Sequence, residues 1–214
     1  MEYEANPIPW KAANFSAGFY ASVNYVPGAY DGMLALATTI ATAVEDCGHT
    51  GQKIVVAGYS QGAWVAHMGL DFLARTAPAL AERVVAIALL SDPLRAPYSM
   101  VPYGVSGASE SSQGVASTKF AYMALKDYEN YFNLLKFSFP GFFPEDFGAL
   151  KVSDSGYAPE LAMKSVQNCA VLDIVCGFEF EQIDQLLANL DQHGSYDGAD
   201  HVLLGYRMAE MAQW

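Results

Sequence analysis

One short stretch, residues 53–66, constrains the fold of this chain more than any other. Four apolar, mostly β-branched residues from Ile54 to Ala57 predict a short buried strand. The next five residues, Gly-Tyr-Ser-Gln-Gly at 58–62, are expected to turn the chain sharply into a helix opened by Ala63. A strand, a Gly-x-Ser-x-Gly turn and a helix in this order are typical of a nucleophile elbow, which exposes a serine hydroxyl.

The two glycines of this turn have an expected steric role. Ser60 should lie in strained backbone, and a Cβ at Gly58 or Gly62 should collide with the neighbouring strand and helix. The Ser60 hydroxyl would then stand clear of the backbone, at the positive end of the following helix. A simple chain reversal is the alternative, but the strand before the turn and the Ala-rich helix after it favour the elbow.

The string from Gly58 to Ala63 resembles the signature of the cutinase family of serine esterases, which are small α/β-hydrolases without a large cap. It is also similar to that of the phage mycolyl-arabinogalactan esterases, lysins that cut mycolic acid from the mycobacterial cell wall. The resemblance implies a three-layer α/β/α fold around a central, mostly parallel sheet. It also implies ester hydrolysis without a metal or organic cofactor, and no Cys/His cluster suggests one.

Composition restricts the partners. A chain of 214 residues that is 52% hydrophobic and 16% charged is expected to form one domain, residues 1–214, and a monomer. The net charge of −12 disfavours binding to nucleic acid or anionic lipid and favours an uncharged ester substrate. No apolar run is long enough to cross a membrane. Residues 1–4 do not resemble a secretory signal, although the family resemblance implies an extracellular protein.

The rest of the chain predicts alternating strands and helices. Strands are expected at 19–26, ended by Pro27-Gly28, and at 84–90, with a helix from Asp31 or Gly32 to about Asp46 between the first strand and the elbow. This order predicts a parallel sheet with the elbow at its carboxyl edge. The later predictions are strand-like character at 166–176 and helices at 179–190 and 200–214.

Residues 94–165 form an aromatic-rich insertion that the family resemblance does not cover. Within it, residues 137–144 contain four phenylalanines in eight positions, flanked by proline and glycine. Such a segment is either additional core or a lid-like platform for an acyl chain above the elbow.

A serine nucleophile needs a histidine base and an acid, which follow it along the chain in the order serine, acid, histidine in α/β-hydrolases. His49 lies in a turn before the elbow, and His67 lies on the elbow helix and faces away from Ser60. His193 is favoured as the base because its loop, next to Gly194, can reach over the sheet edge. His201, at the start of the last predicted helix, is the alternative.

Asp173 is the favoured acid. It lies in the apolar string Val-Leu-Asp-Ile-Val, where a carboxylate is costly unless it is paired with a group such as a histidine Nδ1–H. Asp92, at the end of the strand after the elbow, is the competing acid. From spacing alone, Cys169 and Cys176 are either a disulfide or two reduced core cysteines.

The string from Cys169 to Cys176 is similar to the cutinase loop in which a disulfide brackets the acid. This resemblance implies a bond between the two cysteines and supports Asp173. Leu172 departs from the glycine usual before that aspartate, which leaves the turn geometry open. The string His-x-x-Tyr from His193 to Tyr196 also resembles the sequence around the family's catalytic histidine.

The oxyanion of the tetrahedral intermediate needs two donors, and the backbone N–H of Gln61 is expected to supply one. The second should follow the first strand of the sheet, which by the resemblance would lie before residue 1. The family partner of Cys47 is missing from the same region. Either the chain is shortened at its N-terminus, or residues 14–16 build this part of the site.

Together these features predict a serine carboxylesterase, with Ser60, Asp173 and His193 as the triad and an uncharged ester with an apolar acyl part as substrate: a polyester, a lipid or a cell-wall glycolipid. Two alternatives remain open. One is a carbohydrate deacetylase of the acetylxylan esterase kind, and the other is a non-catalytic cutinase-like binding protein that lacks a complete oxyanion hole.

Overall fold

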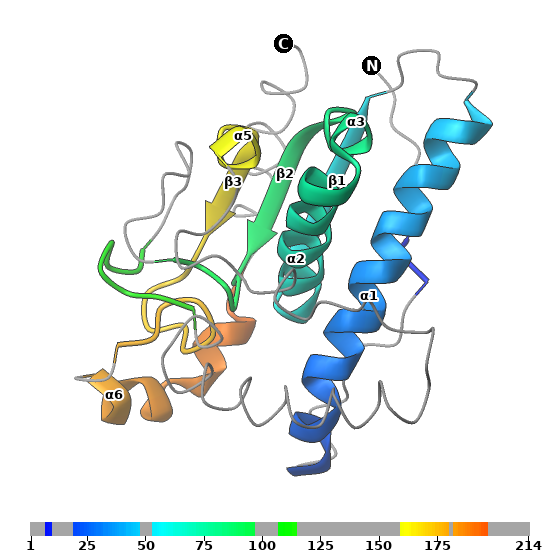
Figure 1. Ribbon diagram of the computed structural model, residues 1–214. Helices are drawn as coiled ribbons and strands as arrows, with labels where there is room; N and C mark the ends of the chain where they lie inside the picture. Colours follow the sequence, from blue (N-terminus) through cyan, green and yellow to red (C-terminus); the bar gives the residue numbers. More distant parts are fainter. Residues whose placement is uncertain are drawn as a thin grey trace.

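A parallel sheet forms the centre of the protein. The computed structural model describes residues 7–9, 19–47, 53–96, 107–114, 159–179 and 182–196. Within these ranges the sheet consists of β1 (Ile54–Tyr59), β2 (Val84–Leu90) and β3 (Ser165–Asn168), paired in that order. The carboxyl ends of all three strands point toward the same side of the molecule (Figure 1). The predicted parallel sheet is therefore confirmed.

Strand β2 is the central strand of the three, which explains its composition. Six of its seven residues are buried, with Val84, Ile87 and Leu89 fully inaccessible to solvent. A strand that is hydrogen-bonded on both edges and covered on its faces reads as a continuous apolar run, as predicted for 84–90. Strand β1 is less buried and begins with a register irregularity between Ile54 and Val55.

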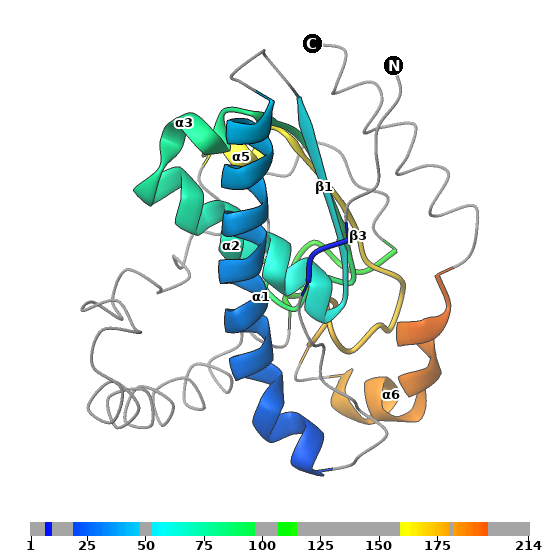
Figure 2. The same ribbon diagram turned by 90° about the vertical axis from the view of Figure 1, so that its right-hand side faces the viewer.

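Two long helices pack together on one side of the sheet (Figure 2). Helix α2 (Gln61–Thr76) follows β1 directly, and α1 (Phe19–Asp46) lies beside α2. The two helices approach closely, because a Cβ added at Gly69 would come within 2.9 Å of Leu36 Cδ2. Their buried residues, including Leu36, Ile40, Leu70 and Leu73, form one core cluster with the sheet residues Ile87 and Leu89.

The strand predicted at 19–26 is wrong, because α1 runs from Phe19 to Asp46 through Pro27-Gly28 without a break. Among the described residues, no strand pairs with the second edge of β1, so this segment does not extend the sheet there. A helix satisfies its backbone N–H and C=O groups internally. Packing of Met33, Leu36 and Ile40 against the core further favours the helix, although Pro27 removes one of its hydrogen bonds.

The remaining described elements are short. They are α3 (Pro78–Ala81), α5 (Pro159–Ala162), α6 (Ile183–Ala188) and the 3₁₀ helix η4 (Leu190–Gly194). The segment predicted as strand-like to residue 176 leaves the sheet after Asn168, and the helix predicted at 179–190 is confined to α6. The phenylalanine-rich stretch 137–144 and the helix expected at 200–214 lie outside the described residues.

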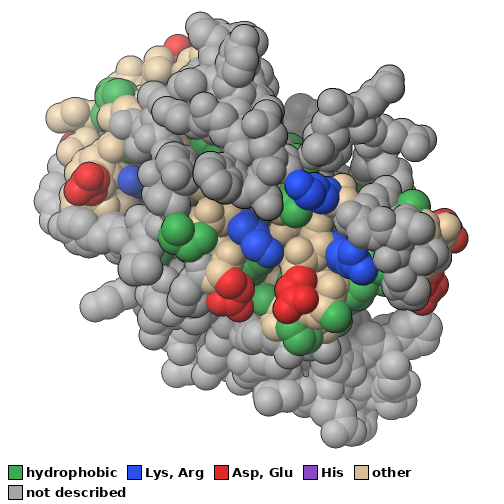
Figure 3. Space-filling model, turned by 90° about the horizontal axis from the view of Figure 1, so that it is seen from above, with side chains coloured by type: hydrophobic (Ala, Val, Ile, Leu, Met, Phe, Trp, Pro, Cys, Tyr) green, Lys and Arg blue, Asp and Glu red, His purple; other side chains and the backbone are tan. Residues whose placement is uncertain are grey.

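The end of the molecule where the strands begin carries charges of both signs. Figure 3 shows Lys and Arg side chains lying beside Asp and Glu side chains on this face. Lys53, Arg83 and Lys164 each precede a strand directly, and the exposed carboxylates Glu82 and Glu160 belong to the same end. The described part of this face therefore carries no continuous basic stripe. No described helix is long and apolar enough to cross a membrane.

Candidate active site

The turn between β1 and α2 has the strained backbone expected of an elbow. Ser60 has φ 53° and ψ −120°, outside the ordinary regions for a residue with a side chain. A Cβ at Gly58 would lie 2.3 Å from the carbonyl oxygen of Gly62, so glycine is required there. The same expectation for Gly62 is wrong, because a Cβ at that position would meet nothing within 4 Å. Close approach constrains only the first glycine of the motif.

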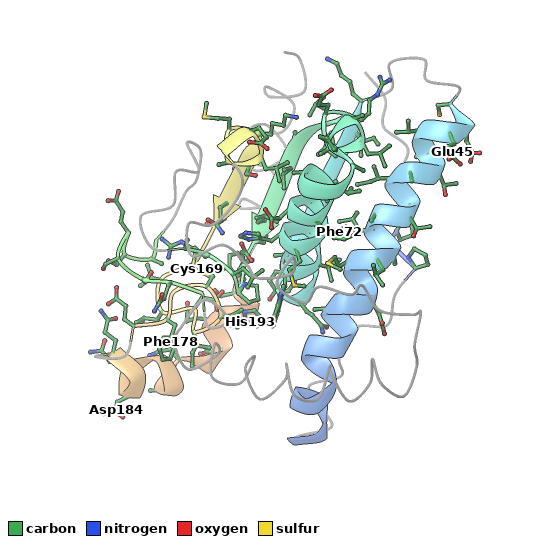
Figure 4. All side chains as sticks on the ribbon, viewed as in Figure 1. Glu45, Phe72, Cys169, Phe178, Asp184 and His193 are labelled. Carbon is green, nitrogen blue, oxygen red and sulfur yellow. A yellow bond between two sulfur atoms is a disulfide. The ribbon has the colours of Figure 1, made fainter. Side chains whose placement is uncertain are left out.

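The structure brings together the three residues predicted as nucleophile, base and acid. The Ser60 Oγ lies 2.8 Å from His193 Nε2, and His193 Nδ1 lies 3.1 Å from Asp173 Oδ1. Ser60 follows β1, Asp173 lies in the loop after β3, and His193 belongs to η4 rather than to the irregular loop that was expected. Figure 4 shows His193 and Cys169 at the carboxyl end of the sheet. Three distant segments therefore converge at one edge.

This arrangement determines what each group can do. For His193 Nε2 to accept the Ser60 proton, the neutral imidazole must carry its own proton on Nδ1, where Asp173 can accept a hydrogen bond. The carboxylate then holds the ring in the productive tautomer and stabilises the imidazolium that forms. The His193 side chain is 27% exposed, so an external substrate can approach the pair.

The Asp173 carboxylate is fully buried, yet it is well supplied with donors. Its Oδ2 accepts hydrogen bonds from Ser91 Oγ and Tyr196 OH, each at 2.6 Å, and its Oδ1 accepts one from the backbone N–H of Val175 at 2.9 Å. Burial by itself raises the pKa of Asp173, but the bonds from His193, Ser91, Tyr196 and Val175 outweigh it and lower the pKa below its ordinary value. Asp173 is therefore held as an anion.

A disulfide encloses the acid. Cys169 and Cys176 are bonded, seven residues apart, as the family resemblance implied. Leu172, immediately before Asp173, has φ 60°, a left-handed conformation that favours glycine. The loop thus keeps the turn for which glycine is the usual residue, at a conformational cost. Cys47 is the described cysteine outside this bond.

A buried arginine fixes the same loop from the other side. The guanidinium of Arg95 donates to the carbonyl oxygens of Cys176 at 3.2 Å, Ser112 at 3.0 Å and Ser109 at 3.0 Å. Burial lowers the pKa of Arg95, an effect that nearby acidic groups oppose. A β-bridge between Gln113 and Phe178 joins the two segments again. Residues 107–114, part of the predicted insertion, therefore support the acid loop, a role that the sequence did not indicate.

Two tyrosines surround the base. Tyr59 stacks on His193, with ring centroids 5.4 Å apart and an interplanar angle of 18°, and its hydroxyl donates to the His193 carbonyl oxygen. Tyr196 meets Tyr59 edge-on and accepts a bond from the Ala170 N–H at 2.9 Å. Burial and the Asp173 charge raise the pKa of both phenols, so both remain protonated donors. The string His-x-x-Tyr was the sequence signal for Tyr196.

The competing residues are occupied elsewhere. Asp92 Oδ2 lies 2.7 Å from His67 Nδ1, and Asp92 also accepts bonds from Gln167 Nε2 and the Leu94 N–H. This buried pair joins α2, which carries His67, to the segment just after β2, which carries Asp92. His49, His201 and residues 14–16 lie outside the described residues. Gln61, the expected oxyanion donor, is the first residue of α2.

Among the described residues, no group of three or more His, Cys, Asp or Glu side chains could hold a metal ion. A serine, a histidine and a buried carboxylate in hydrogen-bond sequence, at the carboxyl edge of a parallel sheet, define a serine-hydrolase site of the α/β-hydrolase type.

Comparison with known proteins identifies the family. The family model Cutinase matches residues 5–200, so the chain belongs to the cutinase family. An acetylxylan esterase structure is similar with a TM-score of 0.52 and 17% identity, covering 86% of this chain and 70% of that one. The catalytic core domain of acetylxylan esterase from Trichoderma reesei is similar with a TM-score of 0.50 and 17% identity, covering 94% and 80%. A search among curated proteins finds no match.

At this level of identity the structural neighbours show the fold alone, and the fold they share with this chain is the cutinase-like α/β-hydrolase fold. The family membership and the contacts among Ser60, His193 and Asp173 together make the protein a carboxylic ester hydrolase.

Proposed function

We propose that Ser60, His193 and Asp173 are the catalytic triad of this hydrolase. The observation that carries the proposal is the unbroken chain of contacts from Ser60 Oγ to His193 Nε2 at 2.8 Å and from His193 Nδ1 to Asp173 Oδ1 at 3.1 Å. The base is partly exposed, so a substrate can reach it, and the acid is fully buried behind it.

In the proposed reaction, the Ser60 Oγ attacks the ester carbonyl carbon while His193 Nε2 takes the proton of the Ser60 hydroxyl. The carbonyl oxygen becomes an oxyanion, which the backbone N–H of Gln61 stabilises at the positive end of α2. The imidazolium returns its proton to the leaving alcohol, and an acyl-enzyme remains. Water then attacks the acyl carbon, with His193 again removing and returning the proton.

The substrate we propose is an uncharged ester with an apolar acyl part. The net charge of −12 disfavours the approach of anionic substrates. Tyr59, beside the nucleophile, is 45% exposed and offers an aromatic surface to an apolar group. Cutin-like polyester, lipid and cell-wall glycolipid are the candidates within this class.

A second candidate is the removal of acetyl groups from carbohydrate. It is supported by two of the similar solved structures, which are acetylxylan esterases. An aromatic ring such as that of Tyr59 can also pack against a sugar, so this feature does not separate the candidates.

The test uses p-nitrophenyl esters from acetate to palmitate, with the Ser60→Ala variant as control. We expect kcat/KM to be highest for medium or long chains and hydrolysis to vanish in Ser60→Ala. An optimum at acetate would favour the deacetylase. A fluorophosphonate probe provides a second test, because a folded protein that is not labelled at Ser60 would be a binding protein instead.

We also propose that the protein acts outside the cell. The disulfide between Cys169 and Cys176 supports this location, since such bonds persist in oxidising compartments. Reducing the bond should release the loop that holds Asp173, so activity should fall in reductant.

A further inference from the structure

Ser91 is the described side chain that touches both the base and the acid without belonging to the proposed triad. It follows β2 and is fully buried. Its Oγ lies 2.6 Å from Asp173 Oδ2 and 3.0 Å from His193 Nδ1. Nothing in the sequence around it, Leu-Leu-Ser-Asp-Pro, suggested a role beyond ending a strand.

The donors and acceptors at this point can be assigned by chemistry. His193 Nδ1 carries a proton when Nε2 faces Ser60, so Nδ1 donates. That proton has two acceptors at similar distance, Asp173 Oδ1 at 3.1 Å and Ser91 Oγ at 3.0 Å. The Ser91 hydroxyl proton is therefore directed to Asp173 Oδ2. Ser91 accepts from the base and donates to the acid, which closes a ring of three side chains.

The backbone places Ser91 at this point. Ser60 N–H donates to the carbonyl oxygen of Leu90, and Ser91 N–H donates to that of Asn168, each at 2.9 Å. These two bonds continue the ladder of the sheet past the strand ends. Ser60 thus follows β1, Ser91 follows β2 and the acid loop follows β3, and these three strands are neighbours in the sheet.

The conformation of Ser91 is an independent observation. Its φ of 51° lies in the left-handed region, which a residue with a side chain occupies at a cost. The described non-glycine residues with positive φ are Ser60, Ser91 and Leu172, and each either belongs to the proposed triad network or adjoins it. Glycine would occupy position 91 without strain, so the strain indicates that the hydroxyl has a compensating use.

We propose that Ser91 is a positioning residue of the catalytic network. Its hydroxyl shares the Nδ1 proton of His193 with Asp173 and holds the carboxylate in the orientation that His193 requires. The proposal rests on the triad proposed above and adds a fourth side chain to it. Because Ser91 is buried, it acts through His193 and Asp173 and does not touch the substrate.

Two substitutions separate the hydroxyl from the backbone. Ser91→Ala removes the hydroxyl and keeps the strained conformation, whereas Ser91→Gly removes the hydroxyl and relieves the strain. Ser165→Ala is the matched control, since Ser165 is a fully buried serine of the same sheet whose hydroxyl donates to the Leu161 carbonyl oxygen. Ser91→Gly should melt at a higher temperature than Ser91→Ala and is the variant expected to fold without difficulty.

With a p-nitrophenyl butyrate assay, we expect kcat to fall about tenfold in both Ser91 variants, the effect of one lost hydrogen bond to a charged network. KM should stay within about twofold, and Ser165→Ala should match the wild type. Proton NMR of the ¹⁵N-histidine-labelled protein gives a second readout. The low-field Nδ1–H signal of His193 should move in both Ser91 variants, because one of its two acceptors is gone.

A loss of kcat in Ser91→Ala that is absent in Ser91→Gly would overturn the proposal, because it would assign the effect to the backbone. An unmoved Nδ1–H signal in both variants would overturn it as well, whatever the change in kcat. The NMR signal requires no turnover, so it tests Ser91 even if the wild type fails to react with a fluorophosphonate probe. That failure would instead contradict the proposed function.

Discussion

The described part of the protein contains two histidine–aspartate pairs, and their surroundings differ more than their geometry. His193 meets Asp173 at 3.1 Å and His67 meets Asp92 at 2.7 Å, in both cases through Nδ1. Both carboxylates are fully buried, but the His193 side chain is 27% exposed and the His67 side chain is 4% exposed. A short contact to a carboxylate therefore does not by itself distinguish the imidazole of the proposed triad from one that only joins two elements.

The two pairs differ in the elements that surround the histidine and in how far its side chain is exposed to solvent. His193 Nε2 lies 2.8 Å from a serine hydroxyl at a strained turn, at the open edge of the sheet. His67 instead lies on α2 and contacts Asp92. The Asp92 carboxylate also accepts a hydrogen bond from Gln167 of β3, which joins the end of β2 to β3. The first pair is placed to exchange a proton with Ser60, whereas the second connects a helix to the sheet beneath it.

The largest expected effect comes from breaking the proposed catalytic pair of His193 and Asp173. His193→Leu should lower kcat/KM at least about ten-thousand-fold, because no base remains to take the Ser60 proton. His67→Leu, the matched substitution, should leave the activity of the folded protein within about fivefold of wild type. Steady-state assays on protein shown to be folded by circular dichroism test both. Equal losses of activity in the two variants would show that the two pairs do not differ in their importance for catalysis.

The second-largest effect comes from breaking the pair of His67 and Asp92. His67→Leu leaves the buried Asp92 without its imidazole partner, and breaking a buried pair costs about 3 kcal/mol. Urea unfolding followed by fluorescence should show this loss. The double variant His67→Leu with Asp92→Asn should recover part of the stability. If the single variant were as stable as the wild type, the pair would have no structural role.

A smaller effect concerns pH. The lowered pKa of Asp173 means that ionisation stabilises the folded state above the unfolded-state pKa of about 3.9, and that this contribution is lost as the pH falls through the folded-state value. Asp173→Asn removes it. The difference in free energy of unfolding between wild type and Asp173→Asn should therefore shrink from pH 6 to pH 3. Asp31→Asn, at an exposed site on α1, is the control.

The smallest effect concerns the contacts of Tyr59 that hold the His193 ring in place. Tyr59→Phe keeps the ring that stacks on His193 and loses only the bond to the His193 carbonyl oxygen. One such bond is worth about 1 kcal/mol, so kcat should fall about fivefold. Tyr59→Leu loses the stack as well and should fall further. Equal activity in Tyr59→Phe and Tyr59→Leu would show that the aromatic ring contributes nothing.

The proposed triad was predictable because each member stands in an informative local string. Ser60 lies in a strand–turn–helix motif, Asp173 lies in an apolar string between two cysteines, and His193 precedes Gly194 and Tyr196. The disulfide followed from the family resemblance and is confirmed. Ser91 and Arg95 were not predicted, because their contacts with the acid loop, at Asp173 and Cys176, span 82 and 81 residues, and no periodicity marks such a contact.

The error at 19–26 has a different cause. Apolar and β-branched residues before Pro27-Gly28 are typical of a strand, and Pro27 is unfavourable inside a helix. Such local preferences are weak, and tertiary packing can override them. In the structure the segment belongs to α1, which runs through the proline and packs on α2.

Local sequence determined the elbow and the buried central strand, and it pointed to Ser60, His193 and Asp173 as the proposed triad, because each of these depends on residues adjacent in the chain. Tertiary structure decided which histidine–aspartate pair faces Ser60, how Asp173 stays ionised while fully buried, and which side chains support it. The physical reason is that these properties depend on hydrogen bonds and burial created when strand ends far apart in sequence meet at one edge.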